Sequence, residues 1–179
     1  MELANELASE LSSLIRDVPD FPIEGILFKD ITTLLRNADA FREVIDWLVE
    51  RYADSDVDQV VAIEARGYIF GAPLAYKLGS GFVPIRKPGK LPAETISESY
   101  ELEYGTNSLE MHEDAIEPGQ RVLLVDDLLA TGGSARAAIN LIERVGGTVV
   151  GVAFLIELDF LHGRDELEGH EVLSLIHFD

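Results

Sequence analysis

The sequence predicts an α/β fold, a single domain with a mainly parallel central sheet flanked by helices. Short apolar segments of strand length alternate along the chain with segments of helical spacing. This alternation is typical of parallel sheets, because each crossover between parallel strands needs a long connection, usually a helix. Polar residues follow several predicted strands, at the edge of such sheets where ligands bind. The length of 179 residues suits one sizeable domain.

The N-terminal segment is predicted to hold two helices separated by a hairpin or structured loop. Apolar residues at helical spacing predict the first helix within residues 3–15. Residues 18–32 contain two prolines and a glycine around an apolar run, which favours a loop or hairpin. Residues 37–52 predict the second helix, with Asn37 or Asp39 as its N-cap.

The rest of the chain supplies the predicted sheet. A hairpin is expected across residues 99–112, where alternation flanks the turn sequence YGTN. Residues 86–95 carry two prolines and a glycine and predict an exposed, mobile loop. Strands are predicted over Val60–Ile63, Phe82–Ile85, Arg121–Val125, Thr148–Ile156 and a last segment near the C-terminus, with helices over Arg66–Gly79, Gly133–Val145 and, briefly, before the last strand.

The net charge of -19 comes from 33 acidic residues against 14 basic ones. So acidic a surface repels nucleic-acid phosphates and anionic lipids, which argues against a DNA-binding or membrane-binding protein. The acidic residues are spread along the chain rather than massed in a tail. One explanation of the acidic composition is that it keeps the protein soluble. We favour a second explanation, a host with a salty cytoplasm in which salt screens the charge.

The sequence contains no cysteine, which excludes disulfides, thiolate metal sites and thiol nucleophiles. The acidic N-terminal stretch lacks the basic and apolar regions of a signal peptide. No apolar run approaches the roughly 18 residues that cross a bilayer. We therefore expect a soluble, cytoplasmic protein.

Two adjacent carboxylates, Asp126 and Asp127, follow the predicted strand at residues 121–125. The two side chains cannot both point into the core, because burying an unpaired charge is costly. We expect them at the edge of the sheet, aimed at a metal ion or at hydroxyl groups. The alternative is an N-cap pair, which is less favoured because the next helix starts near Gly133.

A loop of small residues, Thr131–Ser134, lies between these carboxylates and the helix. Its glycines let backbone N–H groups turn toward an anion, its hydroxyl groups add donors, and the helix dipole adds partial positive charge. It matches neither a Walker A loop nor a dinucleotide fingerprint. A plain turn would also use two glycines, but together with the carboxylates the pattern favours a clamp for a sugar phosphate.

Basic side chains follow other predicted strands. Arg66 comes after the strand at 60–63, and Arg86, Lys87 and Lys90 lie in the loop that follows the strand at 82–85. A cationic loop with no adjacent acid, in so acidic a chain, favours a lid over a strongly negative group. Closure of such a lid expels water and strengthens each charge interaction.

The stretch VLLVDDLLATGGS resembles the phosphoribosyl diphosphate signature of the type I phosphoribosyltransferase family. The stretches FPIEGILFKDITTLL, EARGYIFGAPLAYKLG, IRKPGKLP and ESYELEYG extend the resemblance over nearly the whole chain and narrow it to the members that use adenine. The resemblance implies one phosphoribosyltransferase domain over 1–179. It would comprise an N-terminal helix and base-binding hood at 1–36 and a lid loop and hairpin at 86–112.

The resemblance also implies roles for individual residues. The 5-phosphate would be held by Ala130, Thr131, Gly132, Gly133 and Ser134, and the ribose hydroxyls by Asp126 and Asp127. The diphosphate would meet Arg66, Arg86, Lys87 and Lys90, with Tyr104 also in the phosphoribosyl diphosphate site. Glu103 would be the acid/base partner of the purine, and Arg66 would take part in catalysis. From the residues alone, Glu103 is interpreted as an ordinary surface charge.

The purine base would be bound by Leu27, Phe28 and Lys29. Phe28 would stack on the ring, and backbone groups of Leu27 and Lys29 would recognise its edge. Without the resemblance, Phe28 is interpreted as a core side chain. Members of the family often carry arginine where this chain has Lys29, and lysine keeps the charge but loses the planar fork.

The implied activity is transfer of a 5-phosphoribosyl group from 5-phospho-α-D-ribose 1-diphosphate to adenine, giving AMP and diphosphate. Mg²⁺, held mainly by substrate and water, is the implied cofactor, and a homodimer is the implied assembly. The same transfer to hypoxanthine, guanine or xanthine is the nearest alternative. A regulator that senses phosphoribosyl diphosphate is less favoured, because such proteins need a nucleic-acid-binding portion and this chain carries a net charge of -19.

Overall fold

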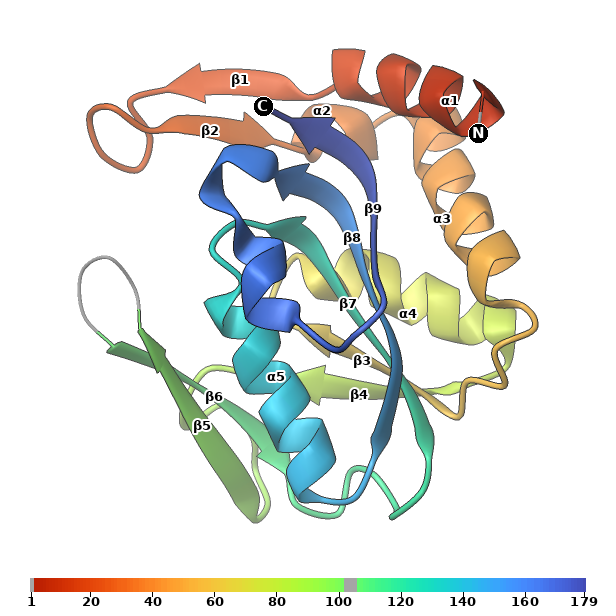
Figure 1. The fold of residues 1–179 in the computed structure, drawn as a ribbon, viewed down its shortest axis with the longest axis vertical. Helices are drawn as coiled ribbons and strands as arrows, with labels where there is room; N and C mark the ends of the chain where they lie inside the picture. The colour runs from red at the N-terminus through yellow and green to blue at the C-terminus, as the bar shows by residue number, and fades with distance from the viewer. Residues whose placement is uncertain (1, 102–105) are drawn as a thin grey trace. The chain divides into compact units, whose positions relative to one another are not determined.

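The computed structural model describes residues 2–101 and 106–179 (Figure 1). The chain divides into two compact parts, Met1–Trp47 and Leu48–Asp179, and each is described by itself. Among the described residues, no helix has the length and apolar character needed to cross a membrane.

The N-terminal part carries the predicted hairpin. Strands β1 (Arg16–Pro19) and β2 (Leu27–Asp30) pair antiparallel between helix α1 (Glu2–Ser13) and the short helix α2 (Thr32–Leu35). Helix α2 was not predicted, because a single turn is too short to leave a periodic pattern.

Helix α3 (Ala38–Tyr52) begins in the N-terminal part and ends in the larger one. The side-chain oxygen of Asn37 accepts the backbone N–H groups of Asp39 and Ala40 at 3.1 and 3.2 Å. Asn37, rather than Asp39, is therefore the N-cap, because its oxygen satisfies donors of the first turn that have no acceptor within the helix.

The larger part is built on a five-stranded parallel sheet in the order β4–β3–β7–β8–β9. This sheet confirms the predicted α/β class. Its strands are mostly apolar and buried, as parallel strands covered on both faces are. Their bounds are β3 Gln59–Ile63, β4 Gly81–Ile85, β7 Arg121–Leu129, β8 Thr148–Leu158 and β9 Val172–Phe178.

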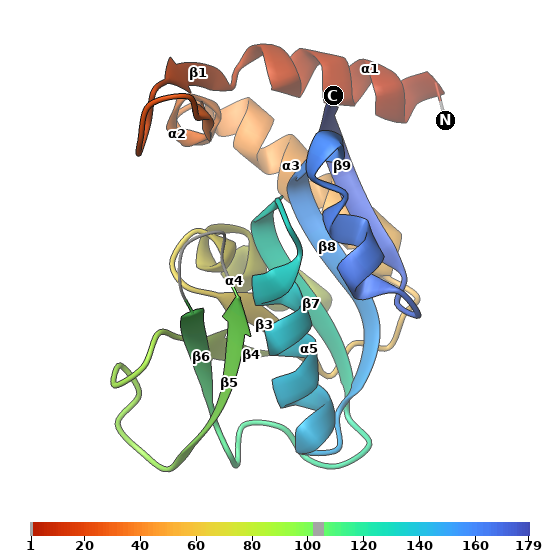
Figure 2. The same cartoon turned by 60° about the vertical axis from the view of Figure 1, so that its left-hand side comes forward.

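Helices α4 (Gly67–Leu78) and α5 (Gly133–Arg144) cover opposite faces of the sheet (Figure 2). Helix α4 connects β3 to β4, and α5 connects β7 to β8. A second hairpin, β5 (Thr95–Glu101) and β6 (Thr106–His112), contacts α5 and confirms the predicted alternation. The residues that connect its strands lie outside the described part of the chain.

Strand β7 is longer than predicted. The sequence suggests an end at Val125, but pairing with β8 continues through Leu128 and Leu129. Asp126 and Asp127 are therefore inside the strand rather than after it, because ladder pairing with β8 outweighs the low strand preference of aspartate.

The short helix predicted before the last strand is replaced by two 3₁₀ turns, η1 (Asp159–Leu161) and η2 (Gly163–Leu167). His162 lies between them with a φ of 52°, in the left-handed region. A residue in that conformation interrupts a right-handed helix, so the segment cannot continue as one.

Candidate functional site

Asp126 and Asp127 lie on the section of β7 that extends beyond its pairing with β3. Asp127 is only 4% exposed, whereas Asp126 is partly exposed. The carboxylate of Asp126 accepts the backbone N–H of Asp127 at 2.9 Å through Oδ1. The start of α4 reaches both side chains, because Gly67 packs on Oδ1 of Asp126 and Arg66 pairs with Asp127.

The buried carboxylate of Asp127 has a charged partner. Arg66 lies at the start of α4, and its Nε is 2.8 Å from Oδ2 of Asp127. The side chain of Arg66 is 43% exposed, so part of it faces solvent. Arg66 was predicted to meet a diphosphate. The structure places it on the carboxylate pair while leaving surface that a ligand can reach.

Both carboxyl groups hold protons more tightly than ordinary aspartates. Burial, followed by the charge of Asp127, raises the pKa of Asp126 well above its usual value. Burial also raises the pKa of Asp127, and Arg66 opposes that effect. A ligand that brings hydroxyl donors or a cation to this pair favours its ionised form.

Gly67 allows the first turn of α4 to approach the carboxylates. A Cβ at this position would lie 2.9 Å from Oδ1 of Asp126 and 2.9 Å from the carbonyl oxygen of Val125. Any larger residue would push the helix away from β7 and separate Arg66 from Asp127.

The loop Ala130–Ser134 joins β7 to α5, which begins at Gly133 as predicted. Gly132 has a φ of 85°, a conformation that glycine adopts without strain. The first N–H groups of a helix have no acceptor within it and can bind an anion. Beside the loop is a cavity of about 160 Å³, lined by Tyr100, Leu128, Leu129, Ala130, Thr131, Gly132, Ser134, Ala135 and Phe154.

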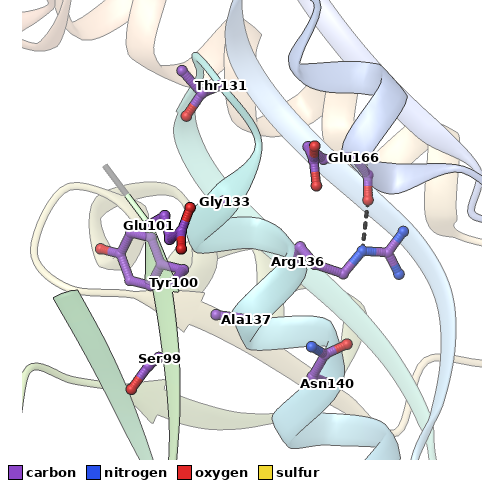
Figure 3. Close-up of a pocket in the computed structure, with 9 residues that line it drawn as sticks. All are labelled: Ser99, Tyr100, Glu101, Thr131, Gly133, Arg136, Ala137, Asn140 and Glu166. Carbon is purple, nitrogen blue, oxygen red and sulfur yellow. Dashed lines mark hydrogen bonds between the residues drawn. The ribbon is translucent and has the colours of Figure 1, made fainter. Parts of the chain in front are cut away.

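A larger cavity of about 370 Å³ lies between β5 and α5 and shares Thr131 and Gly133 with the loop (Figure 3). Arg136 lines it and donates from Nε to the carbonyl oxygen of Glu166 at 2.5 Å. Sequence reasoning gave no role to Tyr100, although it lies in the stretch ESYELEYG, and it missed Arg136 and Glu166, which belong to no motif. The position of Arg136, one turn into the helix that follows the glycine loop, is the one sequence signal that points to the site.

The basic loop has acidic neighbours in space, although it has none adjacent in sequence. Nε of Arg86 is 2.6 Å from Oε2 of Glu64, and Nη1 donates to the carbonyl oxygen of Lys90 at 2.9 Å. Gly89 donates its N–H to Oε2 of Glu110 at 2.9 Å. The sequence gives no sign of these contacts, because Glu64, just after β3, and Glu110 on β6 are brought to the loop only by the fold. Lys87 and Lys90 are exposed.

The predicted base-binding residues lie on β2, in the N-terminal part. Phe28 is half-buried and meets Phe21 edge-to-face, with ring centroids 5.1 Å apart. Nζ of Lys29 is 2.7 Å from Oδ1 of Asp17, so its ammonium group joins the two strands of the hairpin. Leu27 is 51% exposed. Of the remaining predicted site residues, Glu103 and Tyr104 lie outside the described residues.

Known proteins match nearly the whole chain. Residues 30–175 match the family model of the phosphoribosyl transferase domain. The chain is 63% identical over 169 residues to the adenine phosphoribosyltransferase of Chloroflexus aurantiacus, which covers 94% of this chain and 98% of the relative.

Solved structures of adenine phosphoribosyltransferases are also similar to this chain. The structure of adenine phosphoribosyltransferase from Thermoanaerobacter pseudethanolicus has a TM-score of 0.93 at 56% identity, with 96% of this chain and 99% of that chain covered. The Saccharomyces cerevisiae enzyme, complexed with an imino-altritol bisphosphate and adenine, has a TM-score of 0.90 at 43% identity, with 96% and 99% covered.

Proposed function

Because the chain belongs to the adenine phosphoribosyltransferases, within the phosphoribosyl transferase domain family, we propose that it transfers a 5-phosphoribosyl group to adenine. The donor is 5-phospho-α-D-ribose 1-diphosphate, and the products are AMP and diphosphate. The observation that carries this proposal is the succession along β7 and α5. The carboxylates of Asp126 and Asp127 are followed directly by the glycine loop at the helix start.

The sugar phosphate is bound at two adjacent places in this proposal. Backbone N–H groups and hydroxyl groups of Ala130–Ser134 hold the 5-phosphate. The ribose hydroxyls donate to Asp126 and Asp127. Arg66 supports this arrangement, because its ion pair compensates the charge of the buried Asp127.

The diphosphate is the leaving group, and negative charge builds on it as its bond to C1 loosens. Arg66, Arg86, Lys87 and Lys90 are the cations that we assign to it, and Tyr104 completes the set. Exposure of Lys87 and Lys90 supports this assignment, because both can turn toward an arriving anion. Positioned cations lower the barrier by stabilising charge that develops in the transition state.

The residues at the site fit a Mg²⁺ ion that arrives with the substrate. Oxygen atoms are the ligands that Mg²⁺ prefers, and it usually keeps several waters and substrate oxygens. Asp126 and Asp127 supply carboxylate oxygens, but Arg66 competes for Asp127. The ion would neutralise the diphosphate as it leaves. The chain's own residues hold the sugar and compensate the remaining charge.

Recognition of adenine is assigned to Leu27, Phe28 and Lys29, with Glu103 as acid/base partner of the purine nitrogen. Phe28 stacks on the base, and backbone groups of its neighbours recognise the edge. The contact of Lys29 with Asp17 supports recognition through the backbone, because the ammonium group is already used inside the hairpin.

We also infer a cytoplasmic homodimer from the family resemblance. Four large apolar side chains on the β1–β2 hairpin are 41–57% exposed: Phe21, Ile23, Ile26 and Leu27. Exposed apolar side chains that gather in one place are typical of surfaces that bind a partner or a ligand. Sedimentation equilibrium tests the dimer, and a monomer at micromolar concentration would contradict it.

Steady-state rates with adenine, hypoxanthine, guanine and xanthine test the proposed function. We expect kcat/KM for adenine to exceed the others by about 10³-fold or more, because an oxopurine presents the wrong hydrogen-bonding edge. A preference for an oxopurine would contradict the choice of base. Binding of phosphoribosyl diphosphate without turnover of any base would favour the regulator instead.

A further inference from the structure

We infer that Glu157, Arg164 and Ser174 form a positioning network for the loop Ala130–Ser134, acting through the segment η2. The inference rests on the proposed function, in which this loop holds the 5-phosphate. The three residues act on the loop through η2 and do not bind the substrate themselves.

The loop and η2 meet backbone against backbone. A Cβ at Gly163, the first residue of η2, would lie 2.1 Å from the carbonyl oxygen of Ala130. A Cβ at Gly132 would lie 2.3 Å from the carbonyl oxygen of Gly163. No rotation of a side chain can relieve contacts this close, so a displacement of η2 displaces the loop with it.

Arg164, next to Gly163, fixes η2 to the sheet. Its Nε and Nη2 donate to the two carboxylate oxygens of Glu157 at 3.0 and 2.5 Å, and Nη1 donates to the carbonyl oxygen of Val172 at 2.8 Å. Such a two-pronged contact fixes orientation as well as distance. η2 is thereby joined to both β8, which carries Glu157, and β9, which carries Val172.

Glu157 is a rigid anchor for this contact. Glu157 is 5% exposed, and its Oε2 also accepts a hydrogen bond from the hydroxyl of Ser174 at 2.6 Å. Burial favours the neutral acid, but hydrogen bonds from Arg164 and Ser174 outweigh it and lower the pKa of Glu157. The pair therefore stays ionised at neutral pH.

A metal ion is a poorer explanation of the same residues. Glu157, Asp159 and His177 offer three ligand atoms close together. Both oxygens of Glu157 already accept from Arg164, however, and Nδ1 of His177 is 2.9 Å from Oδ1 of Asp159. A guanidinium in this position repels a cation.

The opposite side of η2 is tied to the helix that starts the phosphate site. Arg136 of α5 donates to the carbonyl oxygen of Glu166 at 2.5 Å (Figure 3). η2 is thus held between the sheet and the helix, with the glycine loop packed on its first residue.

The test separates binding of the 5-phosphate from binding of the diphosphate. Arg164→Met removes the fork, and Arg164→Lys keeps the charge without the fork. For each variant, the KM values of both substrates, kcat, and the inhibition constants of ribose 5-phosphate and of diphosphate are measured. We expect KM for phosphoribosyl diphosphate and Ki for ribose 5-phosphate to rise together by about tenfold, because the loop is displaced. The KM for adenine and the Ki for diphosphate should change by less than about twofold.

Two matched controls exclude a general loss of structure. Arg121 is an exposed arginine at the start of β7, at the opposite end of the strand from the glycine loop, and its Nε donates to the carbonyl oxygen of Ser55. Arg121→Met should leave all the measured constants unchanged. Gly163→Ala should raise the KM for phosphoribosyl diphosphate and the Ki for ribose 5-phosphate as Arg164→Met does. Its control, Gly81→Ala, should not, because the atoms nearest to a Cβ at Gly81 belong to the flexible side chain of Gln59.

Ser174→Ala provides a milder change should Arg164→Met fail to fold, and a smaller rise confined to the same two constants is expected. Equal increases for ribose 5-phosphate and diphosphate would overturn the inference, as would unchanged constants in a folded variant. A wild-type chain that binds ribose 5-phosphate but does not consume adenine would contradict the proposed function, and not this inference.

Discussion

Nε of Arg66 lies 2.8 Å from Oδ2 of Asp127, and this ion pair joins the start of α4 to the end of β7. It explains how a carboxylate that is 4% exposed can stand inside a strand of a parallel sheet. Removal of either partner should therefore affect stability and activity in different ways.

Arg66→Met should lower the free energy of unfolding by about 1–2 kcal/mol, because it leaves a buried carboxylate without its partner. This loss of stability is smaller than for a fully buried ion pair, because the side chain of Arg66 is 43% exposed and its charge is screened by solvent. Adding Asp127→Asn should restore most of the stability, while activity stays lost in the double variant. Urea unfolding of the four proteins of the cycle measures the coupling. An Arg66→Met protein as stable as the wild type would rule out a structural role for the pair.

Asp126→Asn should stabilise the fold and abolish activity. The pKa of Asp126 is higher in the folded chain than in the unfolded one, so the folded state binds more protons between the two values. Its contribution to stability therefore falls as pH rises above about 4, the ordinary pKa of aspartate. Unfolding of both proteins from about pH 4 to pH 8 should show a stability gap that widens with pH. A gap independent of pH would contradict this reasoning.

Tyr52→Phe should raise the free energy of unfolding by about 1 kcal/mol, because an unsatisfied buried hydroxyl is costly. The residue is 5% exposed, and its hydroxyl has no hydrogen-bond partner among the residues described. Tyr68→Phe is the matched control. That hydroxyl donates to the carbonyl oxygen of Ile85 at 2.8 Å, so its removal should destabilise. Thermal unfolding measures both, and a destabilised Tyr52→Phe protein would count against the prediction.

The acidic surface should make stability depend on salt. With 33 acidic and 14 basic residues, repulsion between like charges opposes the compact state. Molar KCl shortens the screening length to about 3 Å and should raise Tm relative to dilute buffer. Equal Tm values in both media would contradict the idea of a host with a salty cytoplasm.

Local patterns predicted those features that depend on neighbouring residues. Asn37 caps α3, and Gly133 starts α5, because capping and helix initiation are decided within a few positions. The contacts of Arg66 with Asp127 and of Arg86 with Glu64 could not be predicted in the same way. They depend on the order in which the strands pair, which places β3 between β4 and β7.

Charge was the most misleading sequence signal. Two consecutive aspartates indicated the end of a strand, yet β8 continues to pair with β7 beyond them. Arg164 and Glu157 are seven residues apart and match no motif. Their contact arises because two 3₁₀ turns fold the chain back onto β8. Both outcomes follow from tertiary pairing, which local preference cannot anticipate.

The pairing of β7 determines which parts of the larger unit open most readily to solvent. Its amide protons are engaged with β3 as far as Val125 and with β8 as far as Leu129, so we expect them to exchange with solvent only when the sheet itself opens. The hairpin β5–β6 forms a sheet of only two strands and should exchange far sooner. We therefore expect the backbone that carries Asp126 and Asp127 to be rigid. Under the proposed function, we expect the hairpin and the basic loop before it, rather than β7, to adjust to an arriving sugar phosphate.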